Sequence, residues 1–274
     1  MQGSSRASLR AAVARFDEQV GSLPDGAGSS EVSEGLYAVA ALLDREPSLR
    51  RALNDPASTP DSRRRLVEGL LGGQLGQLPL QQLSHLVADS WATPGDLRDA
   101  VEHVAAVAAL RAAEGSGELD DVEDELFRFS RLLEREPDLR AALTDPGLPA
   151  DRKRGVLDTL LGGRARETTR RLVEVAVLRR RGRSLETVLE ELSELAASRR
   201  ERFVAHVKTA VALHPEQEER LRTSLSRMYG RQVQLQVEVD PAVLGGLLVR
   251  VGDEVLDGTV ARRLETARRD LAAK

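Results

Sequence analysis

The stretch LLDREPSLRRALNDP, residues 42–56, returns as LLEREPDLRAALTDP at residues 132–146. At this offset of 90, residues 42–73 align with residues 132–163 without a gap, and 17 of the 32 positions are identical. Self-similarity on this scale decides the architecture, because each copy is expected to fold into the same unit of secondary structure. The sequence therefore predicts a duplication.

Each copy has the pattern of several helices separated by turns. Apolar residues upstream of the motif recur at i, i+4 and i+7, which marks one helix face. They are Val32, Leu36, Val39, Leu42 and Leu43 in the first copy, and Val122, Leu126, Phe129, Leu132 and Leu133 in the second. Pro47 and Pro137 are predicted to end that helix and to open a short one. A further helix should end at the glycine pairs 72–73 and 162–163, where we expect left-handed backbone.

One helix belongs to both copies in this interpretation. Residues 95–113 match residues 183–201 after a two-residue deletion, and residues 9–16 also fall opposite the 97–110 segment. Helix 97–114 is therefore predicted to close the first bundle and to open the second. The expected domains are a first helical bundle at 1–96, a second at 97–200, and a different unit at 201–274.

The last unit changes its period from that of a helix to that of alternating strands. We expect a strand at 203–213, a helix at 215–230, a strand at 231–240, a strand over 245–258 with a turn at Gly252 and Asp253, and a helix at 259–271. The residues predicted to face inward are Leu221, Leu225 and Met228 on the first of these helices, and Val233, Leu235, Val237 and Val239 on the second strand. The fold class is thus mainly α, two fused helical bundles followed by a small α+β unit ordered strand-helix-strand-strand-helix.

Composition limits the functions that need consideration. The 274 residues are 41% hydrophobic, 3% aromatic and 31% charged, with a net charge of −4 and no cysteine. This excludes disulfides and thiol chemistry, and it lacks the net positive charge typical of nucleic-acid binding. No stretch approaches the roughly 18 apolar residues of a membrane span, and the N-terminus has no apolar signal core. We expect a soluble intracellular protein without direct membrane insertion.

Candidate chemical groups are sparse. The four histidines do not share a helix face at i, i+4, and no carboxylates complete a ligand set, so we predict no metal and no cofactor. Asp253, Glu254 and Asp257 could form an acid–base pair or a cation site, but turn and cap roles explain them better. The arginine runs at 63–65 and 179–183 lie among acidic residues, which favours a solvated or protein-facing surface over nucleic acid. Trp91 is expected in the core.

The C-terminal segment, residues 229–271, resembles a known protein family. Its features are the valine-rich strand 233–239, Asp-Pro at 240–241, the glycine pair 245–246, VRVGDEVLDGTV at 249–260 and RRL at 262–264. These residues resemble the end of the delta subunit of bacterial F-type ATP synthase, the counterpart of the mitochondrial oligomycin-sensitivity-conferring protein. In that family one helical bundle precedes this segment. The present chain has two, as in the long, actinobacterial type of delta subunit.

The resemblance implies a non-catalytic stator subunit, one copy per complex. Such a subunit links the N-terminal helices of the alpha subunits, at the top of the catalytic head, to the C-terminus of the b-type peripheral stalk. The head then resists rotor torque, and proton flow is coupled to ATP synthesis. The implied location is the cytoplasmic face of the plasma membrane, peripheral through the complex.

The resemblance also implies two partner-binding surfaces. An alpha-subunit helix would lie in a groove between the first and fifth helices of a bundle, which in the second copy are 97–114 and 167–180. Candidate lining residues are Val101, Ala105, Ala108, Leu172, Val173, Ala176 and Val177, with plain bundle core as the alternative for each. The stalk-side candidates, which could be contacting or conformational, are Gly245, Gly246, Arg250, Gly252, Asp253, Asp257 and Gly258. Which bundle receives the alpha-subunit helix stays open.

Two other function classes remain at this point. A generic helical adaptor unrelated to the synthase would explain the duplication and the lack of catalytic residues, but not the C-terminal text. An enzyme or RNA-binding protein would require the arginine runs or the carboxylates to converge in space.

Overall fold

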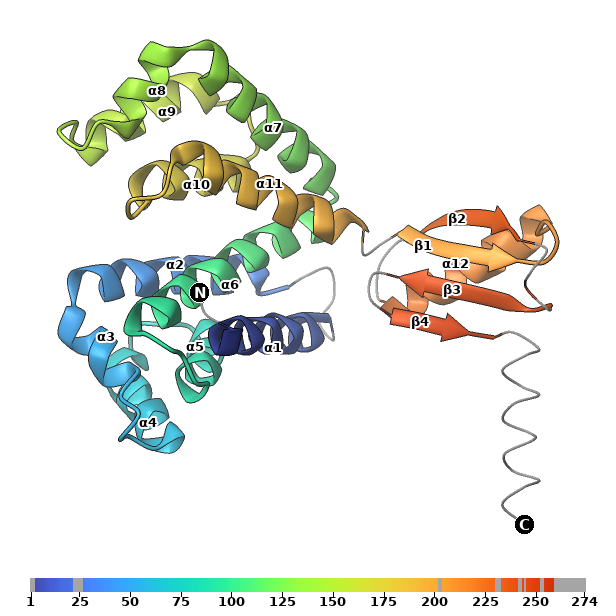
Figure 1. Cartoon of the computed structure of the whole chain (residues 1–274), viewed down its shortest axis with the longest axis horizontal. Helices are drawn as coiled ribbons and strands as arrows, with labels where there is room; N and C mark the ends of the chain where they lie inside the picture. Colours follow the sequence, from blue (N-terminus) through green and yellow to red (C-terminus); the bar gives the residue numbers. More distant parts are fainter. Residues whose placement is uncertain are drawn as a thin grey trace. The chain divides into compact units, whose positions relative to one another are not determined.

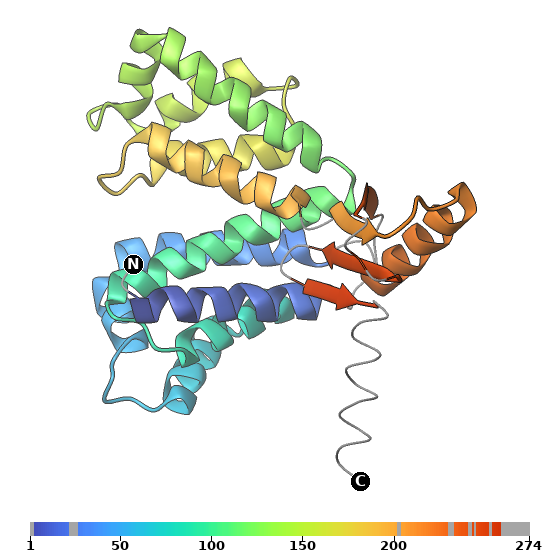
Figure 2. The same cartoon turned by 45° about the vertical axis from the view of Figure 1, so that its right-hand side comes forward.

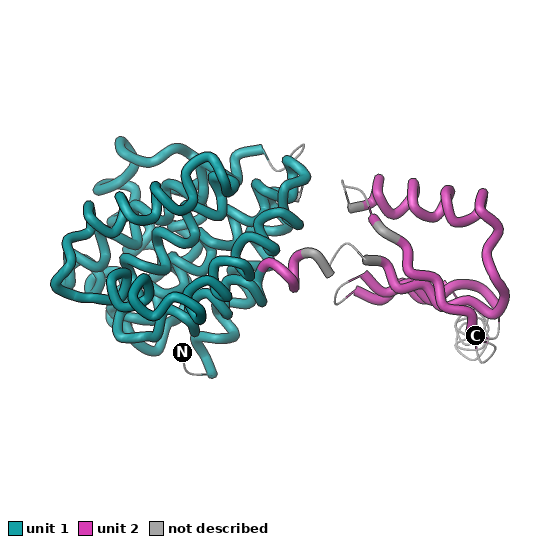
Figure 3. The backbone as a smooth tube through the Cα atoms, turned by 90° about the horizontal axis from the view of Figure 1, so that it is seen from above, with its two compact units in different colours: residues 1–195 teal, residues 196–274 magenta. Residues whose placement is uncertain are grey.

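The computed structural model describes residues 3–21, 27–201, 204–229, 233–240, 243, 245–251 and 254–258. The chain divides into two compact units, residues 1–195 and 196–274, coloured separately in Figure 3. The predicted fold class, mainly α with a small C-terminal α+β unit, is confirmed. The division into three domains at 96/97 and 200/201 stays a prediction.

The helices of the two copies share their bounds at the offset of 90 to within one residue. In the first copy they are α2 (Ser29–Arg45), α3 (Pro47–Leu53), α4 (Pro60–Leu71) and α5 (Gln77–Ala88). Their counterparts are α7 (Leu119–Arg135), α8 (Pro137–Thr144), α9 (Ala150–Leu161) and α10 (Glu167–Leu178). Helix α1 (Gly3–Gly21) precedes the first set, and α11 (Leu185–Glu201) follows the second. Pro47 and Pro137 open short helices as predicted, because a proline at the first helical position lacks only an amide hydrogen that would be unbonded anyway.

Helix α6 (Pro94–Gly115) lies at the centre of this helical unit. Its start is fixed by Thr93, whose hydroxyl accepts a hydrogen bond of 3.1 Å from the backbone N–H of Asp96. The helix packs against α1, α2, α3 and α5 of the first copy and against α7 and α10 of the second (Figures 1 and 2). Buried residues therefore occur on nearly every side of it, a pattern typical of a helix inside a core.

The glycine pairs after α4 and α9 differ from the prediction. Of these four residues only Gly163, with φ of +67°, has left-handed backbone. Gly72 is right-handed, and a Cβ placed on it would lie 2.5 Å from the carbonyl oxygen of Glu68. The expectation of left-handed backbone at both pairs was therefore wrong for three of the four positions. At Gly72 close backbone approach is the constraint instead.

The C-terminal unit is a four-stranded sheet with one described helix. Its elements are β1 (Val204–Thr209), α12 (Pro215–Tyr229), β2 (Gln234–Val239), β3 (Leu247–Val251) and β4 (Glu254–Asp257). The strand order is β2-β1-β3-β4, with β1 parallel to β2 and the other pairs antiparallel. The turn predicted at Gly252 and Asp253 lies outside the described residues, and the segment around it forms two strands. The predicted helix 259–271 also lies outside them.

One side of this sheet forms a core with α12. The buried residues are Ala205, Val207, Leu225, Val233, Val249 and Val251. Two residues predicted to face inward do not, since Met228 is 64% exposed and Val239 is 50% exposed. Both lie near the end of an element, Met228 in the last turn of α12 and Val239 at the last position of β2, where an ideal period no longer guarantees a covering neighbour.

A matched pair of glycines tests the contact between α2 and α5. A Cβ on Gly35 would lie 2.6 Å from Cβ of Pro79, whereas Gly155 in the middle of α9 has nothing within 4 Å. We expect Gly155→Ala to raise the free energy of unfolding by about 0.5–1 kcal/mol through helix propensity. Gly35→Ala should lower it by about 1–3 kcal/mol through overpacking. Urea denaturation measures both, and a stabilised Gly35→Ala protein would contradict the packing described here.

Candidate partner-binding sites

The first predicted surface lies on α6 and α10, which pack against each other. All seven candidate residues are buried, with exposures between 0% and 2%: Val101, Ala105, Ala108, Leu172, Val173, Ala176 and Val177. They belong to the packed interior of the helical unit. Contact with a partner helix stays a prediction for them, and it would require a neighbouring helix to move first.

Helix α2 of the first copy contacts the same pair of helices. Arg171 of α10 forms an ion pair of 2.9 Å with Glu34 of α2. Arg179, which follows α10, donates a hydrogen bond of 2.9 Å to the carbonyl oxygen of Tyr37. Tyr37 is 4% exposed, and burial raises the pKa of its phenol, as does the nearby charge of Glu102 of α6, with Arg179 and Arg171 opposing. Tyr37 therefore lies close to both α6 and α10.

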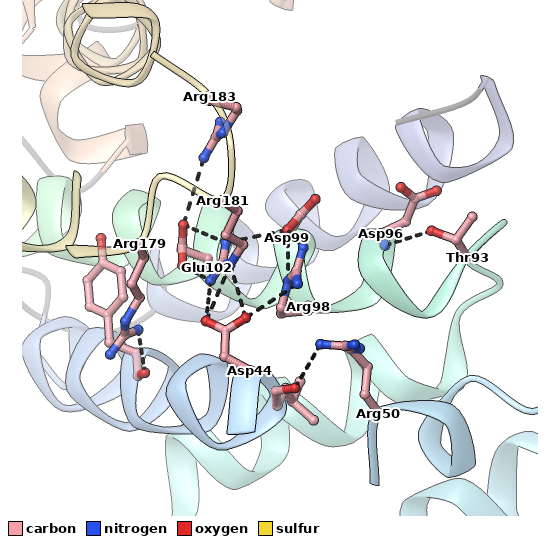
Figure 4. A network of polar contacts seen from close by, with 12 residues as sticks. Asp44, Arg50, Thr93, Asp96, Arg98, Asp99, Glu102, Arg179, Arg181 and Arg183 are labelled. Carbon is pink, nitrogen blue, oxygen red and sulfur yellow. Dashed lines mark hydrogen bonds and ion pairs between the residues drawn. The ribbon is translucent and has the colours of Figure 1, made fainter. Parts of the chain in front are cut away.

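A network of ion pairs extends this contact (Figure 4). Arg181 holds Asp44 of α2 through two hydrogen bonds of 3.0 and 2.9 Å, and it reaches Glu102 of α6 at 3.1 and 2.5 Å. Arg98 joins Asp44 at 3.3 Å and Asp99 at 2.9 Å. Such two-pronged arginine–carboxylate contacts are directional as well as attractive.

The charge of Arg181 is stabilised by this network despite partial burial. Its side chain is 16% exposed. Burial alone would lower the pKa of the guanidinium, but hydrogen bonds and attraction from Asp44 and Glu102 outweigh it and raise the pKa. Arg181 also has a positive φ of +50°, which is unusual for a residue with a side chain. The arginine run at 179–183 thus faces protein, one of the two alternatives considered for it.

Sequence reasoning missed the acceptor side of these contacts. Glu34, Tyr37, Asp44 and Glu102 were not predicted to meet arginines, because Asp44 and Arg181 are 137 positions apart. The one signal available was the arginine run itself, since five residues with four cations need anionic neighbours wherever they fold against protein.

The stalk-side candidates gather mainly at one end of the β3–β4 hairpin. Gly245 and Gly246 precede β3 with φ of +71° and +86°, a backbone conformation that glycine permits, and contact with the stalk stays a prediction for both. Asp257 stands opposite Leu248 at the end of β4, and the N–H of Gly258 donates to the carbonyl oxygen of Leu247 at 2.9 Å. Arg250 is exposed at the last but one position of β3. Gly252 and Asp253 lie outside the described residues.

The described part of the chain contains no group of three or more His, Asp or Glu side chains arranged to hold a metal ion. His103 of α6 is largely covered, and burial lowers the pKa of its imidazole while Glu191 partly opposes that shift. Within the same residues, no helix has the length and apolar character needed to cross a membrane.

Comparison with known proteins assigns the chain to a family. The model of the ATP synthase delta (OSCP) subunit matches residues 101–271, from within α6 almost to the C-terminus. The chain therefore belongs to the ATP synthase delta (OSCP) subunit family.

The full-length relatives are more specific than the family model. The ATP synthase subunit delta of Parafrankia sp. is 50% identical over 99% of both chains. That of Streptomyces griseus is 48% identical over 99% of this chain and 100% of its own, and that of Thermobifida fusca 44% over the same shares. Alignment over the whole length shows that these relatives also extend across residues 1–100, which the family model leaves unmatched.

Core and surface leucines should respond differently to truncation. We expect Leu172→Ala, at a residue with 0% exposure, to lower the free energy of unfolding by about 2–5 kcal/mol through lost burial and a cavity. Leu70→Ala on α4, where the side chain is 48% exposed, should cost less than about 1 kcal/mol. Denaturant titrations of both variants give the comparison, and an equally small loss at Leu172 would mean that α10 does not pack as described.

Proposed function

We propose that the chain is a non-catalytic stator subunit of the F-type ATP synthase. In this role it joins the N-terminal helices of the alpha subunits to the C-terminus of the b-type peripheral stalk, one copy per complex. It lies at the cytoplasmic face of the plasma membrane, held there by the complex. Family membership is the observation that carries the proposal, with identity of 44–50% to delta subunits along the entire chain in support.

The division into two compact units suits a protein that binds two partners. The helical unit, residues 1–195, is proposed to bind the alpha-subunit helices, and the sheet unit, residues 196–274, to bind the stalk. Helix-in-groove recognition uses an apolar stripe at helical spacing, which a bundle can receive between two of its helices. Two linked contacts raise the effective concentration of each for the other, so modest individual affinities suffice.

The helical unit offers two equivalent pairs for such docking. The first and fifth helices are α6 and α10 in the second copy, and α1 and α5 in the first. The seven candidate residues on α6 and α10 would become contacts only if the helices that bury them separate. The pair α1–α5 is joined by the ion pair of Arg15 with Asp89 and by a hydrogen bond from Gln19 to Gln81.

Calorimetry with two peptides tests the proposal on the full chain. One peptide is the N-terminal segment of the alpha subunit and the other is the C-terminal segment of the b-type subunit, both from the same organism. We expect both to bind and neither to compete with the other, since they use separate units. Absence of binding by the alpha-subunit peptide, with the protein folded, would overturn the docking part of the proposal.

The stalk-side surface has its own matched test. Arg250 and Arg227 are both exposed arginines of the sheet unit, on β3 and α12. Replacing either with alanine should change the free energy of unfolding by less than about 0.5 kcal/mol. We expect Arg250→Ala to weaken binding of the b-type peptide about tenfold, and Arg227→Ala to leave it within twofold. Equal effects of the two variants would exclude Arg250 as a specific contact.

A further inference from the structure

Helix α2 is buried over a broad arc of its surface. Val32, Leu36 and Leu43 share one part of that arc and are fully or almost fully buried. Ser33, Tyr37 and Asp44 share a second side, since their spacing of four and seven residues returns to the same direction on a helix. Ser33 and Tyr37 are 3% and 4% exposed. This second side is therefore covered as well, so α2 has more than one neighbouring helix.

The cover is α6 together with the end of α10. Tyr37 lies where charges of Glu102 on α6 and of Arg171 and Arg179 on and after α10 act on its phenol. The ion pair of Arg171 with Glu34 and the hydrogen bond from Arg179 to the Tyr37 carbonyl join the same helices. Helix α2 of the first copy thus contacts both α6 and α10.

The arginine turn, residues 179–183, is built to hold this contact. Arg180 anchors it to the second copy by donating to the carbonyl oxygen of Thr144 at 2.6 Å. Arg181 and Gly182 then have positive φ values of +50° and +82°, so the chain reverses sharply there. The reversal accompanies the two-pronged contacts of Arg181 with Asp44 on α2 and Glu102 on α6. Arg183 adds pairs with Glu102 at 4.0 Å and Glu191 at 2.5 Å.

We propose that the arginine turn fastens α2 onto the α6–α10 pair, so that the extra bundle fills this surface from within the chain. A partner helix that binds the helical unit leaves α2 in place and docks elsewhere on it. The fastening of α2 by the arginine turn is inferred from the contacts alone, whereas docking of the partner away from α2 rests on the proposed function. The role of the arginine run is therefore intramolecular.

The accessibility of a single introduced cysteine measures how well α2 is covered, because the chain has no cysteine of its own. Ser33→Cys places a thiol of nearly the same size at a buried position whose hydroxyl has no hydrogen-bond partner among the described residues. Ser30→Cys is the matched reference, three residues away on the same helix and exposed. Under native conditions we expect a maleimide to label Ser33→Cys at least 100-fold more slowly than Ser30→Cys. Similar rates would show that α2 is not covered and would overturn the proposal.

Variants of the turn then test the fastening. Arg181→Met in the Ser33→Cys chain should accelerate labelling at least tenfold, and Arg181→Lys, which keeps the charge, should accelerate it less. Arg166→Met is the control, because Arg166 also pairs with two carboxylates, Glu118 at 2.8 Å and Asp121 at 2.6 Å, but within the second copy. Labelling in that control should stay within twofold. No acceleration by Arg181→Met, or equal acceleration by Arg166→Met, would exclude the turn as a specific fastening.

A last measurement separates this inference from the proposed function. The alpha-subunit peptide is added at saturation, as judged by calorimetry, and labelling of Ser33→Cys is repeated. We expect the rate to change less than twofold, since α2 stays seated. A tenfold acceleration would show that the partner displaces α2, and it would overturn the inference that the partner docks with α2 in place. If the peptide does not bind, the docking part of the proposed function fails. The labelling of the Arg181 variants then still decides whether the arginine turn fastens α2.

Discussion

The helical unit depends on one helix that two bundles use at once. Helix α6 packs against α1, α2, α3 and α5 on behalf of the first copy and against α7 and α10 on behalf of the second. It can do so because its buried positions are mostly alanine and valine: Ala100, Val101, Val104, Ala105, Ala106, Val107, Ala108 and Ala109. Small side chains let neighbouring helices approach from several directions without overpacking. A larger residue suited to one bundle would force the other apart.

Sharing a helix also explains why charged residues gather at one place between the copies. A helix buried on most sides leaves little room for a second apolar interface, and the remaining contact between α2 and α10 is made by polar groups. Arginine is suited to this because its planar guanidinium satisfies two carboxylates in fixed directions. Arg181 does so with Asp44 and Glu102, which leaves neither carboxylate unpaired next to the core. Removing one partner of such a partly buried ion-pair network lowers the free energy of unfolding by more than the intact network adds relative to an apolar contact.

The sequence predicted what is local and missed what joins distant segments. Short-range patterns in the sequence indicate where helices begin and where strands alternate. The short helices that open at Pro47 and Pro137 and the α+β class of the C-terminal unit were therefore predicted correctly. The prediction that Val239 faces inward was wrong. Alternation shows which side of a strand a residue occupies, but not whether a neighbouring element covers that side at the end of the strand. The pairing of Asp44 with Arg181 had no local signal at all. The candidate site residues were found only by resemblance, and they are buried where α6 and α10 pack against each other.

A stator function places a mechanical demand on this arrangement. A load between two partners would act on whichever contact within the chain slides most easily, and apolar helix contacts resist separation better than they resist sliding, because the hydrophobic effect has no direction. The hydrogen bonds of Arg181 and Arg179 to α2 are directional, so they oppose sliding of α2 against the second copy. The continuous helix α6 also joins the two copies covalently. Under the proposed function, the duplication therefore adds a second bundle without adding a flexible joint.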